Sequence, residues 1–238
     1  SLKKPYDTHL INIMGTINFL ENIRNINKKI IFIYSSSDKA YGELKNRKEY
    51  KEGDSLDSTY PYDVSKSSSD LICQSYSKTY SMRVGIIRCG NIYGPGDFNL
   101  KRLIPEVILS TIEKKKFVIR SDGKSTRDYV YVDDVADAYL RLFKNIKKSK
   151  TKLKIYNVSS KFNYSVLQIV NMILKKMGNL KLKPIILNNS KQELNFQRLN
   201  YSKIQRELKW KPKTDIDLGI EKTIEWYIRF YNFLKNKK

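Results

Sequence analysis

Residues 30–42 read IIFIYSSSDKAYG, a short apolar run followed at once by small polar residues. A continuous apolar run of this length is typical of a strand buried on both faces of a parallel sheet, and it predicts a strand over 30–34. A second such run, RVGIIR, predicts a strand over 83–88. A polar loop over 35–59 and a helical pattern over 62–80 lie between them, and strands joined in this way indicate a parallel α/β protein.

The rest of the sequence continues this alternation. Helical spacing of Leu10, Ile13, Ile17, Leu20 and Ile23 predicts a helix over 8–26. Further helices are expected near 102–115, 133–146, 165–177, 201–208 and 217–234, and further strands near 117–119, 129–132, 154–158 and 182–187. In the helix over 165–177 the side chains expected to face inwards are Val166, Ile169, Val170, Ile173 and Leu174.

The composition favours a packed, basic protein. The 238 residues include 46 Lys+Arg against 24 Asp+Glu, a formal net charge of +22. With 40% hydrophobic and 12% aromatic residues the chain can build a core, which excludes a disordered polybasic tail. The excess charge is mostly scattered lysine, whereas nucleic-acid readers favour arginine for bidentate contacts, so we expect a solvated surface and no nucleic-acid partner. The alternative, a basic nucleic-acid-binding protein, would bind with a steep salt dependence.

Several other classes are disfavoured. No apolar run approaches the ~18 residues that span a bilayer, and residues 1–5 lack the apolar core of a signal peptide, so we expect a cytoplasmic protein without a membrane partner. Cys73 and Cys89 form no disulfide framework. The single histidine, His9, excludes metal sites built on several histidines and leaves one candidate base for a Ser-His-Asp triad. We therefore expect no metal site.

Tyr62 and Lys66 form a Y-x-x-x-K pair at the start of the helix predicted over 62–80. Side chains four residues apart share one face of a helix. An ammonium beside a phenol favours the phenolate and lowers a tyrosine pKa from its ordinary value of about 10, which makes a general base. The motif alone is weak in a chain rich in tyrosine and lysine, but only this match follows a buried strand and its polar loop.

The polar residues after the first strand add a second signal. Groups that bind ligands in parallel sheets gather at the carboxyl ends of strands, which is where Ser37, Asp38 and Lys39 are expected. Taken singly, Ser37 is a turn or cap residue, Asp38 the start of an Asx turn and Lys39 a solvated charge. The order of strand, serine, loop, tyrosine and lysine is much more specific than any of its members.

The glycine fingerprint of a dinucleotide-binding protein is absent from this sequence. Such a protein opens with a strand, a G-x-G-x-x-G turn and a helix. The nearest approach is Gly94-Pro95-Gly96, which follows a late strand. The first clear strand, over 30–34, already follows a helix, so the sequence reads as if it begins in mid-domain.

The motifs together resemble the extended short-chain dehydrogenase/reductase family, in its NAD-dependent branch of nucleotide-sugar dehydratases and epimerases. The resemblance covers nearly the whole chain. Besides the Tyr62/Lys66 pair, its segments are NIMGTINFL at 12–20, SSSDKAYG at 35–42, RCGNIYGPG at 88–96, LIP at 103–105, RDYVYVDDV at 127–135, YNV at 156–158 and LKWKP at 208–212.

This resemblance implies a Rossmann-like parallel sheet, truncated at its N-terminus, with a smaller C-terminal substrate-binding lobe. Residues 1–100 would be the remaining part of the NAD-binding domain, and residues 101–238 mainly the substrate-binding lobe, interwoven with the first. In this family the glycine fingerprint and an acidic ribose ligand precede the helix that corresponds to 8–26. Family members also dimerise through the helices corresponding to 8–26 and 62–80, so a homodimer is expected.

The activity implied is that of an NAD-dependent 4,6-dehydratase acting on a nucleotide sugar. Ser37-Asp38-Lys39 is most similar to CDP-glucose 4,6-dehydratases, whereas sister dehydratases carry Thr-Asp-Glu and plain 4-epimerases usually lack the acidic pair. The segment over 120–129 departs from the CDP-glucose enzymes, so the nucleotide base stays open. The alternatives are an NDP-sugar 4-epimerase, as in UDP-glucose 4-epimerases, and a non-catalytic fragment.

The resemblance also implies roles for the catalytic residues. Tyr62 would take the proton of the sugar 4-hydroxyl, Lys66 would promote its ionisation and hold the nicotinamide ribose, and Ser37 would bind the same hydroxyl. Asp38 would protonate the departing 6-hydroxyl, and Lys39, or a base near it, would take the C5 proton. Lys39 could act as a base only in its uncharged form, which desolvation or the charge of Lys66 would favour.

The remaining implied residues are binding residues. Those expected to contact NAD are Ser35, Ser36, Tyr62, Lys66, Cys89 and Ile92. Those expected to contact the nucleotide-sugar substrate are Asn91, Arg102, Arg120, Arg127 and Arg198, the arginines through the forked donors that suit phosphate. A surface ion pair is the structural alternative for each arginine.

Overall fold

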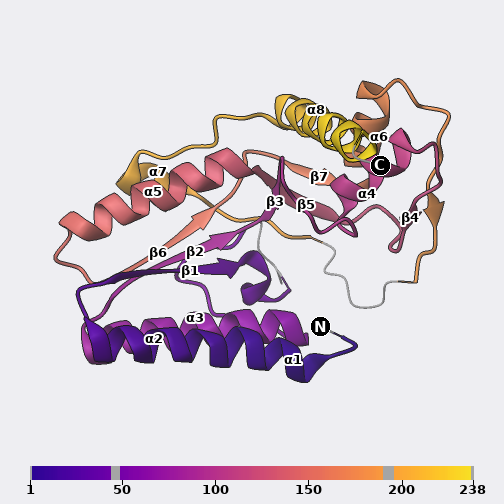
Figure 1. Ribbon diagram of the computed structural model, residues 1–238. Coiled ribbons are helices and arrows are strands. Elements are labelled where there is room, and N and C mark those ends of the chain that lie inside the picture. The colour runs from indigo at the N-terminus through magenta and orange to yellow at the C-terminus, as the bar shows by residue number, and fades with distance from the viewer. Residues whose placement is uncertain (1, 44–48, 190–195, 237–238) are drawn as a thin grey trace. The chain divides into compact units, whose positions relative to one another are not determined.

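The computed structural model describes residues 2–43, 49–189 and 196–236, and the chain forms two compact units (Figure 1). Residues 44–48 of the predicted 35–59 loop lie outside the described residues. Unit 1 consists of Ser1–Gly90, Val135–Ser159 and Gln197–Lys211. Unit 2 consists of Asn91–Asp134, Ser160–Phe196 and Pro212–Lys238. Each unit is therefore built from segments that are distant in the sequence, and the assignment of a substrate-binding role to the later residues stays a prediction.

Unit 1 contains a parallel sheet in the order β1-β2-β6, formed by β1 (Ile31–Ser37), β2 (Arg83–Cys89) and β6 (Leu153–Val158). The predicted parallel strands are confirmed. β1 extends past the apolar run, however, because Ser35, Ser36 and Ser37 pair with Ile87, Arg88 and Cys89. The expectation that the strand ends at Tyr34 was wrong, since backbone pairing holds these serines in the sheet despite their polar side chains.

Helices cover both faces of this sheet (Figure 1). The predicted helix over 8–26 is formed by α1 (Pro5–His9), the π-helical segment η1 (Leu10–Met14) and α2 (Gly15–Ile26). These lie with α3 (Pro61–Tyr80) on one face, and α5 (Val132–Lys148) lies on the other. A Cβ added at Gly85 would lie 2.8 Å from side-chain atoms of Leu142 and Ile146, so the glycine in β2 permits the close approach of α5. The short helix α7 (Ser202–Leu208) completes the helices described in this unit.

Unit 2 is built on short strands. β3 (Asn91–Tyr93) pairs parallel with β5 (Thr126–Tyr131), and β5 pairs antiparallel with β7 (Asn163–Ser165). β4 (Val118–Ile119) pairs with β8 (Ile185–Ile186). β3 is thus not among the predicted strands, and the strand expected over 182–187 is reduced to two residues. Elements this short carry too little periodicity for a sequence pattern to define them.

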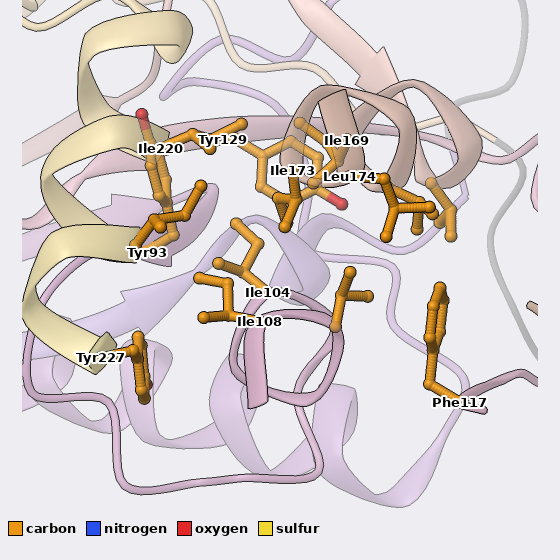
Figure 2. Packing of buried hydrophobic residues seen from close by; sticks show 14 of the residues in the cluster. Tyr93, Ile104, Ile108, Phe117, Tyr129, Ile169, Ile173, Leu174, Ile220 and Tyr227 are labelled. Atoms are coloured by element: carbon orange, nitrogen blue, oxygen red, sulfur yellow. The ribbon is translucent and has the colours of Figure 1, made fainter. Parts of the chain in front are cut away.

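The core of unit 2 lies between its strands and α4 (Leu103–Ile112), α6 (Val166–Lys176) and α8 (Ile216–Lys235). Figure 2 shows aliphatic side chains of these helices packed with Tyr93, Tyr129 and Tyr227. All five side chains of α6 that were predicted to face inwards are buried, which confirms that prediction. Ser165 and Gln168 form a capping box that begins the helix.

Within the described part of the chain, no helix is both long enough and apolar enough to cross a membrane. Cys73 and Cys89 are both buried, and no disulfide joins them.

Candidate active site

The carboxyl end of β1 turns directly into a short 3₁₀ helix, η2 (Asp38–Tyr41). The Ser37 hydroxyl donates to Oδ1 of Asp38 at 3.0 Å and accepts from the backbone N–H of Lys39 at 3.3 Å. Ser37 therefore caps η2, as expected from its residue type, and it fixes the Asp38 carboxyl at the same time. Asp38 itself is almost fully buried.

Tyr62 and Lys66 begin α3, which faces the same end of the sheet. Tyr60 has an extended backbone and Pro61 occupies the first helical turn, where its missing N–H costs nothing. Tyr62 is 36% exposed. One turn later, the Lys66 ammonium donates to the backbone carbonyl of Ser35 at 2.8 Å. A hydrogen bond thus joins the helix that carries the Y-x-x-x-K pair to the last residues of β1.

The Lys66 ammonium also lies over an aromatic ring. Its Nζ is 5.2 Å from the centroid of Tyr34, within the range of a cation–π contact, which favours the charged form. Burial acts in the opposite direction and lowers the pKa of Lys66. A lysine in this environment therefore releases a proton more readily than one in water.

Asp63 is a charged residue of this region that the sequence interpretation missed. It is only 4% exposed although it follows the half-exposed Tyr62. Burial raises the pKa of its carboxyl, the Lys39 charge opposes that rise, and the Asp38 charge adds to it. The charges of Asp38, Lys39 and Asp63 therefore influence one another. The sequence carried no signal for this, because one acidic residue in the first turn of a helix is ordinarily a solvated end charge.

The residues predicted to contact NAD differ in their surroundings. Ser35 is exposed, whereas Ser36 is buried and its hydroxyl has no hydrogen-bond partner among the residues that the structure describes. Cys89 is buried opposite Ser37 in the sheet, and Ile92 belongs to β3 in unit 2. The hydroxyls, the phenol and the ammonium at the end of β1 are donors that suit the ribose of a nicotinamide dinucleotide. These groups fit that end of NAD.

The predicted substrate-binding residues are spread over both units. Asn91 begins β3, and Arg127 is buried in β5, where its Nη1 donates to the carbonyl of Thr126 at 2.9 Å. Arg102 is exposed and pairs with Asp97 at 3.2 Å. Arg120 is also exposed, and Arg198 belongs to unit 1, where it lies 3.8 Å from Glu49. Arg102 and Arg198 thus have the ion pairs expected of surface arginines, while Arg127 has the burial of a residue held in place.

Sequence reasoning also missed a buried ion pair behind the site. Arg88 was noted only as part of a motif and Asp70 not at all, yet the two form a fully buried pair at 2.9 Å. Burial opposes the charge of Arg88, but the hydrogen bonds that it donates to Asp70, together with the nearby Tyr41 and the Asp70 charge, outweigh burial and raise the arginine's pKa. The signal was present: an arginine at the end of an otherwise apolar strand needs a buried partner.

The sequence and the fold of this chain were both found to be similar to those of known enzymes. The model of the NAD dependent epimerase/dehydratase family matches residues 1–159. A probable dTDP-glucose 4,6-dehydratase of Sinorhizobium fredii is 30% identical over 233 residues, which cover 91% of this chain and 65% of that protein. The chain spans about two thirds of the length of the curated relatives it matches.

Solved structures give the same result. A dTDP-glucose 4,6-dehydratase of Bacillus anthracis in complex with NAD superimposes with a TM-score of 0.85 at 27% identity, covering 97% of this chain and 71% of that one. A UDP-glucose 4-epimerase of Thermotoga maritima with UDP-glucose gives a TM-score of 0.88 at 25% identity, covering 97% and 74%. The expected Rossmann-like α/β fold and the resemblance to dehydratases and epimerases are confirmed.

Proposed function

We propose, on the premise that this chain belongs to the NAD dependent epimerase/dehydratase family, that it serves the 4,6-dehydration of a hexose linked to a nucleoside diphosphate. The observation that carries this proposal is the contact of Lys66 with the end of β1 at 2.8 Å. This contact brings the Tyr62/Lys66 helix to the strand end that leads into Ser37, Asp38 and Lys39. The relatives named above act on either dTDP-glucose or UDP-glucose, so the nucleotide base is part of the question to be tested.

Tyr62 is the proposed base for the sugar 4-hydroxyl, and Lys66 assists its ionisation. NAD, when bound, would accept the hydride of C4 and, once water has left, would give that hydride back to C6, with a proton returning to C5. The Tyr62 phenol lies in the first turn of α3 and is partly exposed, so a bound substrate can reach it and give up its hydroxyl proton to it. Ser37 holds the same hydroxyl in place, and its bond to Asp38 at 3.0 Å couples the two residues.

Elimination of water needs an acid and a base beyond Tyr62. Asp38 is the proposed acid for the departing 6-hydroxyl, because its carboxyl lies 3.0 Å from the Ser37 hydroxyl that is proposed to bind the neighbouring sugar hydroxyl. Lys39 is the proposed partner that takes the C5 proton. An oxidised C4 makes that proton acidic, so a moderate base suffices.

A 4-epimerase is the second candidate, and one observation favours it. Lys39 occupies the position next to Asp38, and a charged ammonium cannot accept a proton. If Lys39 stays charged, the chain has the groups for oxidation and reduction at C4 but not for elimination.

The test is turnover of CDP-, UDP- and dTDP-glucose in the presence of NAD, with NMR to identify the product. A 4-keto-6-deoxy sugar supports the dehydratase, and a sugar with inverted C4 supports the epimerase. We expect Tyr62→Phe to lose nearly all turnover while it retains binding of the nucleotide sugar. Turnover close to wild type in that variant would contradict the proposed base. Binding without turnover in the wild-type chain would favour the non-catalytic alternative.

A homodimer is proposed through the exposed face of α1, η1, α2 and α3. Large exposed apolar side chains on these helices include Tyr6, Ile11, Phe19 and Leu71, the first two at least 70% exposed. Exposed apolar side chains gathered on helices that pack together are typical of an interaction site. We expect light scattering to give a dimer for the wild type and a monomer for the Phe19→Glu/Leu71→Glu variant. A wild-type monomer at assay concentration would contradict the proposal.

A further inference from the structure

One buried guanidinium joins the two elements that carry the candidate catalytic side chains. α3 carries Tyr62 and Lys66 and, one turn later, Asp70, while η2 carries Asp38 and Lys39 and ends at Tyr41. Arg88, from the end of β2, donates through Nε and Nη2 to the two carboxylate oxygens of Asp70, both at 2.9 Å. Its Nη1 donates to the hydroxyl of Tyr41 at 2.8 Å.

The geometry of this junction leaves Arg88 little freedom. Both donors on the Asp70 side are used in a bidentate fork, which fixes the plane of the guanidinium. The Arg88 Cζ lies 4.8 Å from the centroid of the Tyr41 ring, and Nη1 also donates to the carbonyl of Glu52 at 3.1 Å. Arg88, Asp70 and Tyr41 are each no more than 2% exposed, so water cannot replace a lost bond without rearrangement.

Tyr41 is in turn fixed from its other sides. Its hydroxyl donates to Oδ1 of Asn157 at 2.8 Å, and its ring stacks on that of Tyr50 with centroids 4.6 Å apart. Asn157 donates through Nδ2 to the carbonyls of Tyr50 and Asn200. The end of η2 is therefore held by a closed set of buried hydrogen bonds, with Arg88 as the member that reaches α3.

We propose that Arg88 and Tyr41 are positioning residues that hold η2 in register with α3, so that Asp38 and Lys39 keep their place relative to Tyr62 and Lys66. The inference rests on the proposed function of those four residues. A displacement of about 1 Å between reacting groups can cost up to about 100-fold in rate. Loss of this link should therefore lower kcat more than it changes KM. If the pair only filled the core, its loss would lower stability and leave the rate per folded molecule unchanged.

The test compares two buried tyrosines. Tyr41→Phe removes the hydroxyl that links Arg88 to Asn157 and keeps the ring. Tyr156→Phe is the matched control, because Tyr156 is also fully buried and its hydroxyl donates at 2.7 Å to Glu207 on α7. The readouts are kcat and KM, the urea midpoint, and hydrogen exchange of the peptide that contains residues 38–41.

We expect Tyr41→Phe to lower kcat about tenfold at an unchanged KM and to speed exchange in the 38–41 peptide severalfold. Tyr156→Phe should lower the urea midpoint to a similar extent and change neither kcat nor that exchange. Equal kcat and equal exchange in the two variants would overturn the inference. Arg88→Lys keeps the charge and loses the fork, so it should lower kcat and speed exchange over 38–41 more than Tyr41→Phe does. If Arg88→Lys does not fold, the comparison of Tyr41→Phe with Tyr156→Phe decides.

The exchange readout separates this inference from the proposed function. A wild-type chain without turnover would contradict the proposed function alone. In that case faster exchange over 38–41 in Tyr41→Phe, but not in Tyr156→Phe, still supports the link between η2 and α3. Unchanged exchange in both variants overturns it.

Discussion

Two helices of this protein bury one face each, and they do so with opposite chemistry. The buried side chains of α6 in unit 2 are all aliphatic: Val166, Ile169, Val170, Ile173 and Leu174. Those of α3 in unit 1 are nearly all small and polar: Asp63, Ser65, Ser67, Ser69, Asp70, Cys73 and Ser77. The first helix is held by removal of apolar surface from water, and the second by buried hydrogen bonds.

The polar face of α3 remains stable because its hydroxyls find partners nearby. Ser65 and Ser67 donate to carbonyls one turn back, at 2.7 and 3.0 Å. The Ser69 hydroxyl shares its proton between the carbonyl of Ser65, at 2.8 Å, and that of Asn12 in η1, at 2.9 Å, and so reaches another segment. Small side chains let η1 and the strands approach α3 closely, and directional bonds then fix its rotation about its axis. The comparison teaches that directional hydrogen bonds stabilise the helix carrying Tyr62 and Lys66 and also fix its position. The apolar face of α6 stabilises that helix without directional bonds.

The largest effect should follow from breaking the ion pair of α3. Arg88→Met leaves the buried Asp70 carboxylate without its charged partner, with the neutral amide of Gln74 still donating at 2.8 Å, and this should cost about 3–5 kcal/mol in the free energy of unfolding. Urea unfolding of unit 1 can be followed through Trp210, which is fully buried there, in a Trp226→Phe background. The double variant Arg88→Met/Asp70→Leu should recover most of the loss. A single variant that loses less than about 1 kcal/mol would mean that Asp70 is stabilised in some other way.

The next effect tests the apolar helix. Ile173→Ala opens a cavity in the core of unit 2 and should cost about 3 kcal/mol, in the range for aliphatic residues truncated in a packed core. Asn171→Ala is the control, since Asn171 is exposed on the same helix and its loss should stay within about 0.5 kcal/mol. Equal unfolding free energies for the two variants would show that the face of α6 is not packed as described.

A smaller effect is expected from a single hydroxyl of α3. Ser69→Ala removes one hydrogen-bond donor, while the Asn12 carbonyl keeps its bond from the Thr16 hydroxyl at 2.6 Å, so the loss should be about 1 kcal/mol. Ser75→Ala makes the same substitution at an exposed position of the same helix and should be near neutral. If both variants unfold at the same urea concentration, the polar face of α3 contributes placement without measurable stability.

The same contrast explains what the sequence could predict. The aliphatic face of α6 follows directly from its helical spacing, and all five residues were assigned correctly. The ends of α3 were predicted within one residue, but its buried face was invisible, because serine and aspartate at helical spacing are ordinarily read as solvated. Ser35 to Ser37 were expected beyond the strand for the same reason.

The order of residues in the sequence was enough to propose the candidate site. It was not enough to predict the buried side chains that hold the site in place. The contact of Lys66 with the end of β1 agrees with the predicted arrangement of strand, loop and helix. The burial of Asp63 and the junction of Arg88, Asp70 and Tyr41 depend on side chains far apart in the sequence meeting at one place. A single sequence marks such a meeting only by a charged residue in an apolar strand, as at Arg88.

The smallest effect concerns a comparison of two carboxylates: that of Asp70, which is paired with Arg88, and that of Glu52, which accepts from a backbone N–H. Glu52 accepts from the backbone N–H of Asn157 at 2.9 Å, but burial still raises the pKa of its carboxyl. A raised pKa in the folded state means that the folded protein binds the proton more tightly than the unfolded one. The stabilisation is therefore complete below the ordinary glutamate pKa of about 4.3 and is lost as the pH rises through the folded-state value.

Glu52→Gln keeps an oxygen to accept from Asn157 and removes the partly buried charge. We therefore expect this variant to be more stable than wild type in urea at pH 7, with the difference shrinking to zero as the pH falls below about 4.3. Asp70→Asn should behave in the opposite way at pH 7, because it removes the partner of Arg88. A Gln variant that is less stable than wild type at pH 7 would mean that the Glu52 charge is itself held by the junction around Arg88, and that the polar network of unit 1 extends through the loop that carries Glu52.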